Sequence, residues 1–269
     1  MMIKGEIMKR IIFFDIDGTL LNENTKTIPN SCINALYKAK ENGHLLIVNT
    51  GRPYTGISQI IKDLPFDGYI CGCGTHIIYH NEEIYYHALS QDERKRIIKL
   101  NYQYDIDSVL EGKEGSYYKT KYNHPFIQNM MDMYKNECLK AQSYSIDDTP
   151  IFDKFTSWYV KDVDIEGYKK ELEEDYTIIQ RDIDFVEIVP KACSKAIGIQ
   201  KLIDYLHMPI ESTMSVGDST NDLSMLTYTF DSIAMGNSNP VLFDQVTFIT
   251  TNIDDDGIYN ALKHYKLVD

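Results

Sequence analysis

The hydrophobic pattern near the start of the chain is that of buried strands alternating with amphipathic helices. Ile11 to Phe14 is a short continuous apolar run, and HLLIVNT (44–50) and DGYICGCG (67–74) are two more. Between these runs, apolar positions spaced for one helix face predict a helix from about Pro29 to Gly43 and another near 55–64. Continuous apolar strands are typical of a parallel sheet that is covered on both faces. The order of elements therefore predicts a doubly wound α/β fold.

The pattern changes in the middle of the chain. IIYHNEEIYYH (77–87) predicts a hairpin that turns at Asn81 and Glu82. Ser90, followed three residues later by Glu93, predicts a capping box that starts a helix. Beyond it the expected strands are shorter, alternate in polarity and are rich in Tyr; examples are 155–160, 176–180 and 184–189, with helices near 124–141 and 164–174. This stretch is an α+β insertion with the size of a domain.

The first pattern returns near Cys193 and continues to the end of the chain. We expect a helix over 193–206, strands at 212–218 and 232–236, and helices near 220–228, 240–246 and 254–265. The fold class is therefore α/β, with a doubly wound, mainly parallel, Rossmann-like core interrupted by an α+β domain. We expect the core to comprise residues 1–82 and 190–269, and the inserted domain to comprise residues 83–189.

The composition is that of a globular protein, with 43% apolar and 25% charged residues among 269. A formal net charge of −13 argues against binding to nucleic acid or to an anionic membrane. Five scattered cysteines do not suggest a disulfide framework. Neither a membrane helix nor a signal peptide is expected, so we predict a cytoplasmic protein. Met8 is a second candidate for the natural start, and residues 1–7 are expected to form a poorly ordered tail.

Polar residues follow three of the predicted core strands, at the edge where open α/β sheets bind their ligands. Asp15 and Asp17 come at the end of the first strand, Thr50 ends the second, and Asp218 ends the strand at 212–218. Neighbouring carboxylates stay ionised when a cation lies between them, and an oxygen-only donor set suits Mg²⁺. A single Asp after a strand is usually a helix N-cap, but that interpretation is weak for all of these strand ends at once.

The charge balance at this edge predicts a phosphate substrate. The Thr50 hydroxyl and the Gly51 amide can donate to phosphate oxygens, and Gly18 and Gly51 allow close approach of the backbone. Lys191 and Lys195 lie at the return from the insertion. Lys195 falls in the first turn of a predicted helix, where a cation is disfavoured by the helix dipole, so either it has a purpose there or it is an ordinary surface lysine. A metal with a lysine and hydroxyl donors stabilises a transferring phosphoryl group.

These segments resemble the four motifs of the haloacid dehalogenase-like hydrolase superfamily. The motifs are FDIDGTLL at 14–21, NTGRP at 49–53, the helix lysine Lys195 and GDSTND at 217–222. Their order and spacing resemble the Cof-type branch, whose large type IIB cap lies between the second and third motifs. The resemblance covers nearly the whole chain. It implies a Mg²⁺-dependent phosphatase that hydrolyses small phosphorylated metabolites, such as sugar phosphates, nucleotides or phosphorylated cofactors, through an aspartyl-phosphate.

The resemblance also implies residue roles. Asp15 matches the nucleophile, and Asp17 matches the general acid that later acts as base. Asp15, Asp218 and the backbone carbonyl of Asp17 match the Mg²⁺ ligands. The residues implied to bind phosphate or substrate are Ile16, Thr50, Gly51, Lys195 and Asn221, with Asp222 and Ser219 in supporting positions. Asp222 matches the acid that orients the lysine.

One stretch departs from the family. After the third strand the family commonly has Asn-Gly-Ala, whereas this chain has Cys71-Gly72-Cys73-Gly74-Thr75, so that Cys73 replaces an amide near the cap hinge. We favour two buried thiols over a metal site, because the C-x-C spacing is short and no second pair exists. Arg52 either contacts substrate or forms a surface ion pair.

The cap carries aromatic and imidazole side chains that can stack on a substrate ring or bond sugar hydroxyls; they are Tyr117, Tyr118, Tyr122, His124 and Trp158. An ordinary sheet face is the favoured alternative for them. Other functions stay open: a phosphotransferase or mutase on the same scaffold, a phospho-accepting signalling domain, or a binding protein with an inactive site. We expect a small phosphorylated metabolite as partner, no nucleic acid or membrane, and a monomer or weak homodimer.

Overall fold

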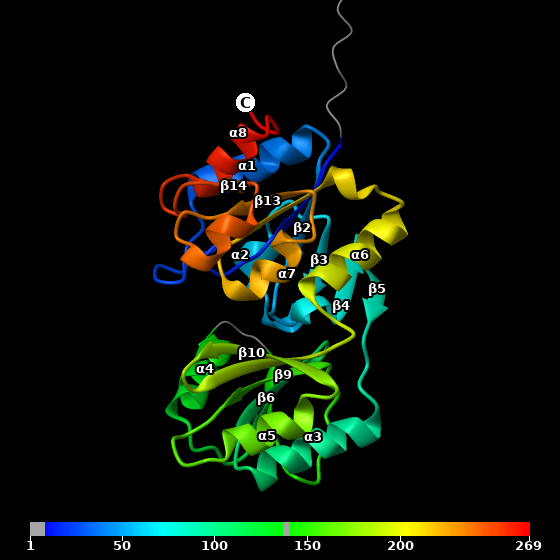
Figure 1. Cartoon of the computed structure of the whole chain (residues 1–269), viewed down its shortest axis with the longest axis vertical. Coiled ribbons are helices and arrows are strands. Elements are labelled where there is room, and N and C mark those ends of the chain that lie inside the picture. Colours follow the sequence, from blue (N-terminus) through cyan, green and yellow to red (C-terminus); the bar gives the residue numbers. More distant parts are fainter. Residues whose placement is uncertain (1–8, 137–139) are drawn as a thin grey trace, which may run out of the picture.

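The computed structural model describes residues 9–136 and 140–269. The expected N-terminal tail and the end of the helix expected near 124–141 lie outside these residues. The described chain forms two sheets with helices packed on them (Figure 1). No helix among these residues has the length and apolar character to cross a membrane.

The larger sheet has eight strands in the order β14-β13-β12-β1-β2-β3-β4-β5. Its strands are β1 (Ile11–Phe14), β2 (Leu45–Asn49), β3 (Gly68–Cys71), β4 (His76–Tyr79), β5 (Glu82–Tyr86), β12 (Thr213–Gly217), β13 (Asp231–Ala234) and β14 (Phe248–Ile249). The strands from β14 to β3 are parallel, and the hairpin β4–β5 adds an antiparallel edge. The expected α/β fold class is confirmed.

Helices cover both faces of the larger sheet, which explains the continuous apolar run of β1. On one face Ile12 and Phe14 pack in a core that includes Leu36 of α1 (Asn30–Glu41) and Ile258 of α8 (Gly257–His264). On the other face Phe13 packs with Ile199 of α6 (Lys195–Leu206). Alternate residues of one strand thus enter different cores, so each position must be apolar. The short helices α2 (Gln59–Lys62) and α7 (Leu223–Leu226) complete this part.

The smaller sheet has six strands in the order β10-β11-β9-β6-β7-β8. They are β6 (Asp107–Gly112), β7 (Gly115–Lys119), β8 (Ala141–Tyr144), β9 (Lys154–Trp158), β10 (Tyr176–Asp182) and β11 (Phe185–Pro190). The helices α3 (Gln91–Gln103) and α5 (Ile165–Leu172) pack on the face turned away from the larger sheet (Figure 1). Helix α4 (Pro125–Asn136) contacts β8. The sequence pattern did not predict β6, β7 or β8.

Several predicted elements differ in detail from those observed. The third strand ends at Cys71, and residues 72–74 form a 3₁₀ turn. Residues 54–56, 220–222 and 240–245 are likewise 3₁₀ rather than α-helical. At the start of α3 the Ser90 hydroxyl accepts the amide of Glu93 at 3.1 Å. The carboxylate of Glu93 is instead engaged by Arg96 and Tyr176, so only half of the predicted capping box is present.

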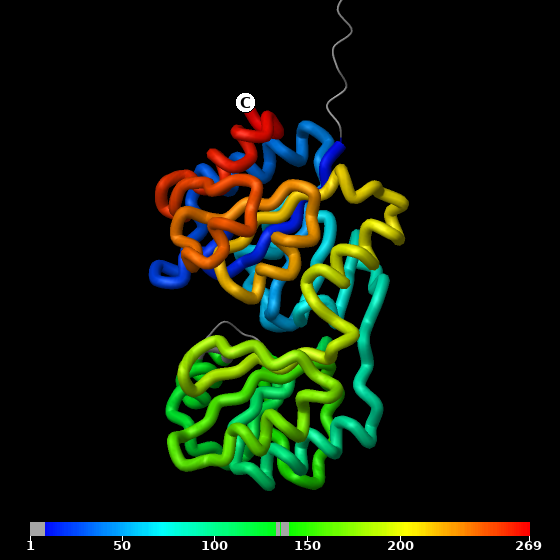
Figure 2. The backbone as a smooth tube through the Cα atoms, viewed as in Figure 1, coloured from blue at the N-terminus to red at the C-terminus, as the bar shows by residue number. Residues whose placement is uncertain are grey.

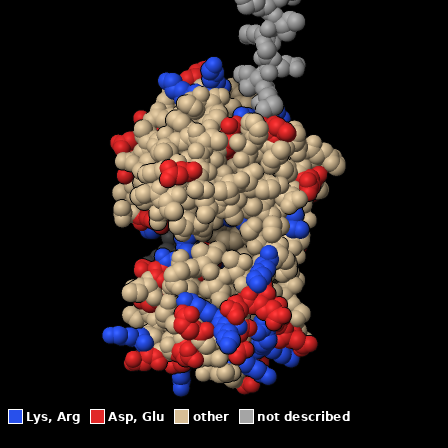
Figure 3. Space-filling model, in the orientation of Figure 1, with Lys and Arg blue, Asp and Glu red and all other residues tan. Residues whose placement is uncertain are grey.

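The chain passes between the two sheets twice, once after β5 and once after β11 (Figure 2). β5 belongs to the larger sheet and runs to Tyr86, beyond the expected boundary at residue 82. The division into a core of residues 1–82 and 190–269 and a cap of residues 83–189 stays a prediction. Seen from outside, the surface is hollowed between the two parts, and charged side chains are denser over the smaller sheet in this view (Figure 3).

Candidate active site

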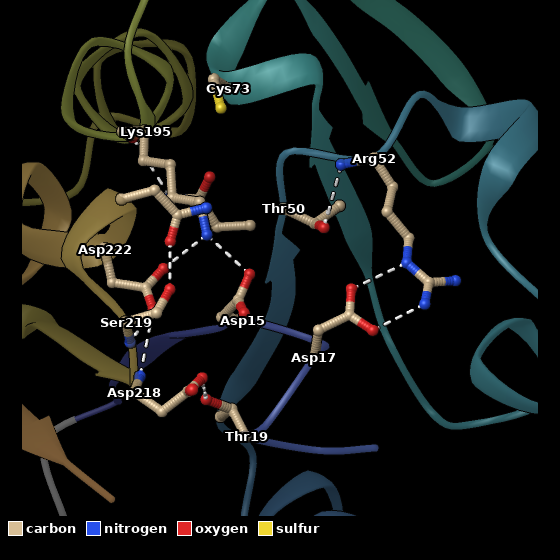
Figure 4. A network of polar contacts seen from close by, with 12 residues as sticks. Asp15, Asp17, Thr19, Thr50, Arg52, Cys73, Lys195, Asp218, Ser219 and Asp222 are labelled. Carbon is tan, nitrogen blue, oxygen red and sulfur yellow. Dashed lines mark hydrogen bonds and ion pairs between the residues drawn. The ribbon is translucent and has the colours of Figure 1, made fainter. Parts of the chain in front are cut away.

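The turn after β1 brings two segments that are distant in sequence into contact. Gly18 has a φ of +79°, and a Cβ there would lie 2.3 Å from a carboxylate oxygen of Asp218. Thr19 donates its hydroxyl to the same carboxylate at 2.9 Å (Figure 4). Glycine is therefore required at this turn both for its backbone angle and for the space that Asp218 occupies. The loops after β1 and β12 converge, as the sequence predicts.

Lys195 is buried between two carboxylates. Its Nζ donates to Oδ1 of Asp15 at 2.6 Å and to Oδ1 of Asp222 at 2.5 Å (Figure 4). The lysine is the first residue of α6, whose N-terminus is capped by the hydroxyl of Ser194. Burial by itself lowers the pKa of Lys195, but the two carboxylates outweigh it and the net shift is upward. The ammonium is therefore charged, and the solvated surface lysine that was the alternative is not what forms.

Three carboxylates gather around this ammonium. Oxygens of Asp15, Asp218 and Asp222 lie within 4.8 Å of one another. Burial and the neighbouring charge of Asp222 raise the pKa of Asp218 to about 7, and the same two causes raise the pKa of Asp15. Three acids against one lysine leave excess negative charge, and the donors are all oxygens. The cluster thus fits a hard divalent cation such as Mg²⁺.

Asp222 occupies the place in this cluster where the sequence suggested Asp17. The Asp222 carboxylate is fixed by the backbone amides of Asp218 and Ser219, each at 3.0 Å from Oδ2, while Oδ1 accepts from Lys195. The carboxylate of Asp17 points the other way, toward Arg52 (Figure 4). The capping turn of residues 219–222 sets the direction of Asp222. Its contact with Lys195 agrees with the role that the family resemblance implies, whereas its place among the oxygens of Asp15 and Asp218 was not predicted.

Asp17 and Arg52 form a bidentate ion pair. Nε of Arg52 donates to Oδ2 of Asp17 at 2.8 Å, and Nη2 donates to Oδ1 at 2.6 Å. Nη1 of Arg52 also donates to the carbonyl of Gly56 at 3.2 Å. Of the two roles considered for Arg52, the structure therefore places it in an ion pair. That pair lies in the wall of the cavity described below rather than on the outer surface.

The loop after β2 supplies the next predicted residues. Thr50 is buried, and its Oγ1 accepts the amide of Arg52 at 3.2 Å. Gly51 lies so close to the smaller sheet that a Cβ would be 2.8 Å from Oε1 of Glu187. Asn49 donates to the carbonyl of Lys195 at 3.2 Å and so ties β2 to α6. The loop is thereby held against both the lysine and the smaller sheet.

A cavity of about 330 Å³ lies between the two sheets. The residues from the larger sheet that line it include Asp15, Asp17, Thr50, Gly51, Asp218, Ser219 and Asn221. Lys195 and Asp222 are not among its lining residues; they are buried behind the lining side chains. The side chain of Ile16 packs in the hydrophobic core, while its carbonyl accepts the amides of the following turn. The volume is at the lower end of the range for small-molecule sites.

Cys73 contacts the smaller sheet. Its φ is +54°, a left-handed conformation that an Asn adopts readily, and its Sγ donates to Oε1 of Glu187 at 3.3 Å. Burial raises the pKa of the thiol, so it is protonated. Cys71 packs in the main hydrophobic core. Both thiols are buried and free, and no metal-like cluster of the described residues includes either.

The five cap residues considered for substrate stacking or hydrogen bonding differ in whether they reach the cavity. Only Trp158 among them lines the cavity. Tyr117 and Tyr118 are buried in hydrophobic clusters, and Tyr122 donates to Gln128. His124 is paired with Asp184 at 3.1 Å. Four of these five side chains therefore serve the packing of the smaller sheet.

Sequence reasoning missed a second buried lysine. Nζ of Lys154 lies 2.5 Å from Oε1 of Glu187 and 2.9 Å from Oε2 of Glu111, and all three residues line the cavity. Lys154, Glu187 and Glu111 lie on β9, β11 and β6, so no local sequence motif predicts that they meet. The alternation in KFTSW, which puts Lys154, Thr156 and Trp158 on one strand face, is the signal that was available.

The chain matches known proteins along its whole length. Residues 12–262 match the family described as haloacid dehalogenase-like hydrolase. The chain is 24% identical to 5-amino-6-(5-phospho-D-ribitylamino)uracil phosphatase YitU of Bacillus subtilis, over 95% of this chain and 97% of that one. It is 25% identical to phosphatase YwpJ of the same organism, over 95% and 99%. The solved structure of the subclass IIB sugar phosphatase BT4131 superposes with a TM-score of 0.82 at 26% identity, covering 97% of this chain and 100% of that one.

Proposed function

The chain belongs to the haloacid dehalogenase-like hydrolases, and on that premise we propose that it is a Mg²⁺-dependent phosphatase of small phosphorylated metabolites. Sugar phosphates, nucleotides and phosphorylated cofactors are the substrates considered. One observation carries the proposal: the buried Lys195 links Asp15 to Asp222 beside Asp218, and Asp15 and Asp218 open into the cavity. The names of the relatives, which include a sugar phosphatase and a phosphatase of a ribitylamino-uracil phosphate, support the substrate class.

The acid cluster would hold the metal. Asp15 and Asp218 offer carboxylate oxygens at the cavity, and Asp222 lies within the same group of oxygens. We add the backbone carbonyl of Asp17 from the family pattern. When bound, Mg²⁺ supplies positive charge that offsets the negative charge of the carboxylates and of the phosphoryl group.

Asp15 is proposed as the nucleophile. Its Oδ1 accepts from Lys195, and no described residue donates to its Oδ2, so that oxygen can attack phosphorus. A bond forms between the Asp15 oxygen and phosphorus while the bond from phosphorus to the leaving oxygen breaks. Lys195, the Thr50 hydroxyl and the Gly51 amide stabilise the phosphoryl oxygens, and Asn221 and Ser219 line the same end of the cavity. Water then attacks phosphorus and releases phosphate and free Asp15.

Asp17 is proposed as the acid that protonates the leaving oxygen and then takes a proton from the attacking water. Both of its carboxylate oxygens are engaged by Arg52. Each oxygen keeps a second lone pair for the proton that is transferred, and we propose that one of the two hydrogen bonds from Arg52 is released when substrate binds. Arg52 thereby acts as a positioning residue for Asp17, and its freed N–H group faces the cavity.

The smaller sheet is proposed to act as the cap, with residues 83–189 covering the core formed by residues 1–82 and 190–269. Its residues form the wall of the cavity opposite the acid cluster. A wall there excludes water that would otherwise compete for the aspartyl-phosphate. We further propose that the protein works in the cytoplasm as a monomer or weak homodimer.

The test is phosphate release from 4-nitrophenyl phosphate by the wild type and Asp15→Asn, each with Mg²⁺ and with a chelator. We expect turnover by the wild type with Mg²⁺ and none in the other three conditions. Asp244→Asn is the matched control, because Asp244 is exposed and outside the cavity. Absence of turnover of a broad phosphomonoester panel by a metal-replete preparation would refute the proposal. Transfer of phosphate to added sugars, rather than to water, would favour a phosphotransferase.

A further inference from the structure

The cavity face of β9 carries three residues of different chemistry in a row. Lys154, Thr156 and Trp158 alternate with Phe155 and Ser157, and all three line the cavity. Residues paired in register on adjacent strands share a face of the sheet. Glu111 pairs with Lys154, Glu187 pairs with Thr156, and Phe185 pairs with Trp158; these three also line the cavity. The face therefore changes from charged to hydroxyl to aromatic along the strand.

The charged end lies next to the proposed catalytic loop. Oε1 of Glu187 accepts from Lys154 and from Cys73, and it sits over the position where a Cβ of Gly51 would be. Gly51 follows Thr50, the proposed phosphate ligand. The end of β9 that carries Lys154 is thus close to the phosphoryl group, and Trp158 is about 13 Å further along the strand, four residues at about 3.3 Å each.

The aromatic end is a wall of near-parallel rings. The rings of Trp158 and Phe185 stack with centroids 4.3 Å apart and planes at 5°. Phe126 of α4 stacks on Trp158 at 5.5 Å and 27°, and Met130 completes this wall of the cavity. Phe126 is 44% exposed. A wall of this kind offers a planar apolar group parallel or edge contacts with several rings.

The middle of the row holds an unused hydroxyl. Thr156 is 6% exposed, and its Oγ1 has no hydrogen-bond partner among the residues that the structure describes. A buried hydroxyl without a partner is unfavourable, and a polar group of a ligand in the cavity would supply the missing hydrogen bond. The neighbouring carboxylate of Glu187 has further lone pairs that can accept hydrogen bonds from hydroxyl groups of a ligand. This position therefore suits a hydroxylated part of a ligand.

We propose that the substrate is a phosphate monoester whose hydroxylated chain or sugar, about the length of a pentose, carries a planar ring. This inference rests on the proposed phosphatase function. The phosphate lies at the acid cluster, the hydroxyl groups meet Thr156 and Glu187, and the ring packs against Phe126, Trp158 and Phe185. Phosphates of simple sugars fill only the charged and hydroxyl positions and leave the aromatic wall unused.

Two substrates that differ in the ring test the inference. Uridine 5′-monophosphate and ribose 5-phosphate share a phosphorylated pentose, and only the first has a planar base. We expect kcat/KM to be at least about ten-fold higher for the nucleotide, mainly through a lower KM, because ring contacts are made in the bound state. Equal values, or a preference for ribose 5-phosphate, would overturn the inference and leave the phosphatase function intact.

Direct binding separates the two proposals. Trp158 is the single tryptophan of the chain, so its fluorescence reports from the aromatic wall. In Asp15→Asn we expect uridine 5′-monophosphate to change this emission saturably and at lower concentration than ribose 5-phosphate. This result would support ring recognition even if no phosphomonoester were hydrolysed. No change with the nucleotide, in a protein that hydrolyses 4-nitrophenyl phosphate, would refute ring recognition alone.

Variants locate the effect. Phe126→Ala removes an exposed ring of the wall and should lower the nucleotide-to-sugar ratio of kcat/KM toward one. Phe230→Ala is the matched control, because Phe230 is 56% exposed and lies outside the cavity. Thr156→Val should raise KM for both pentose phosphates, and Thr156→Ser should restore it. An unchanged ratio in Phe126→Ala, with unchanged KM in Thr156→Val, would show that the smaller sheet does not contact substrate.

Discussion

Each sheet region holds one buried lysine near the cavity, and each lysine is held between two carboxylates. Lys195 lies between Asp15 and Asp222 at 2.6 and 2.5 Å, and Lys154 lies between Glu187 and Glu111 at 2.5 and 2.9 Å. Both lysines are 1% exposed. Their local chemistry is nearly the same, but their surroundings differ.

The difference lies in what surrounds each ammonium. Around Lys195 a third acid, Asp218, adds charge that the lysine does not neutralise, and burial with Asp222 raises the pKa of Asp218 to about 7. Around Lys154, Glu111 and Glu187 accept its hydrogen bonds, and Asp153 is a third buried acid nearby, whose pKa burial raises to about 7. Among the described residues, these acids do not bring three oxygens together as Asp15, Asp218 and Asp222 do. Burial raises the pKa of Glu187, but Lys154 outweighs it, and the pKa falls to about 2. The same lysine arrangement thus supports a cation site in one region and a stable, charge-paired wall in the other.

The largest effect is expected from Lys195→Met. Loss of the ammonium removes a group that stabilises the phosphoryl oxygens, so turnover of 4-nitrophenyl phosphate should fall by about 10²–10³-fold. It also leaves buried carboxylates unpaired, so the free energy of unfolding in a chelator should fall by about 3–5 kcal/mol. Steady-state kinetics and urea denaturation measure the two. Turnover close to that of the wild type would contradict the assigned role of this lysine.

Lys154→Met should affect stability more than chemistry. Two buried carboxylates would lose their partner, at a cost of about 3–5 kcal/mol in the free energy of unfolding. Turnover of acetyl phosphate should fall far less than in Lys195→Met, because Lys154 is paired with Glu111 and Glu187 and not with Asp15. Adding Glu111→Gln and Glu187→Gln should recover much of the lost stability, because the two carboxylates that Lys154 pairs are then replaced by neutral amides. A loss of acetyl phosphate turnover equal to that of Lys195→Met would remove the contrast between the two lysines.

Magnesium should stabilise the protein through the acid cluster around Lys195 and not through the acids around Lys154. At 100 times its dissociation constant, a ligand that binds the native state alone adds about 2.7 kcal/mol to the free energy of unfolding. We expect the corresponding rise in Tm for the wild type and for the Glu111→Gln variant. Asp218→Asn should lose it, because one carboxylate of the cluster is gone. Thermal unfolding with and without Mg²⁺ measures this, and full stabilisation of Asp218→Asn would place the cation elsewhere.

Asp218 and Glu187 should contribute to the pH dependence of stability in opposite directions, each by at most about 1.4 kcal/mol per pH unit. Because the pKa of Asp218 is raised, this carboxyl group is protonated in the metal-free folded protein but ionised in the unfolded chain between pH 3.8 and about 7. The contribution of Asp218 to the free energy of unfolding therefore falls as pH rises through that window. The lowered pKa of Glu187 gives stability above pH 4.5 that is lost as pH falls toward about 2.

Unfolding measured against pH in a chelator checks both signs. Asp218→Asn should flatten the curve between pH 4 and 7, and Glu187→Gln should flatten it below pH 4.5. Asp244→Asn serves as control for the removal of one surface charge. The same curve in wild type and Asp218→Asn would argue that this carboxyl group has an ordinary environment.

The smallest effects are expected at two matched helix caps. Ser90 caps α3 and Ser194 caps α6, each through a hydrogen bond of 3.1 Å to a backbone amide. Replacing either by Ala should cost about 1 kcal/mol. Ser194→Ala should also lower kcat, because Lys195 is the next residue, whereas Ser90→Ala should leave kcat unchanged. Equal kcat in the two variants would show that the cap does not help to position the lysine.

Much of the larger sheet and of its acid cluster was accessible from the sequence. Strands buried on both faces must be apolar at every position, so Ile11 to Phe14 marks β1 without any knowledge of its neighbours. Parallel strands also place their carboxyl ends at one edge, which brings Asp15 and Asp218 together as soon as the topology is known. The order of these motifs along the chain was enough to identify the family.

The smaller sheet was harder to predict because its strands, which are antiparallel except for the pair β7–β8, carry polar residues even where they are buried. DSVLEG (107–112) and GSYYK (115–119) are buried strands without a continuous apolar run. Ser108 and Ser157, for example, satisfy each other through a hydrogen bond of 2.7 Å between their hydroxyls. Such pairs hide the hydrophobic pattern on which strand prediction depends.

The sequence by itself therefore determined the family, the core strands and the residues that follow them, because these depend on burial at consecutive positions and on short motifs. Only the tertiary structure decided that Arg52 forms an ion pair with Asp17, that Asp222 lies in the acid cluster, and that Lys154 is paired with Glu111 and Glu187. These contacts depend on the register of strands and the direction of turns. Register is set by packing between distant segments, and no local pattern of residues specifies it.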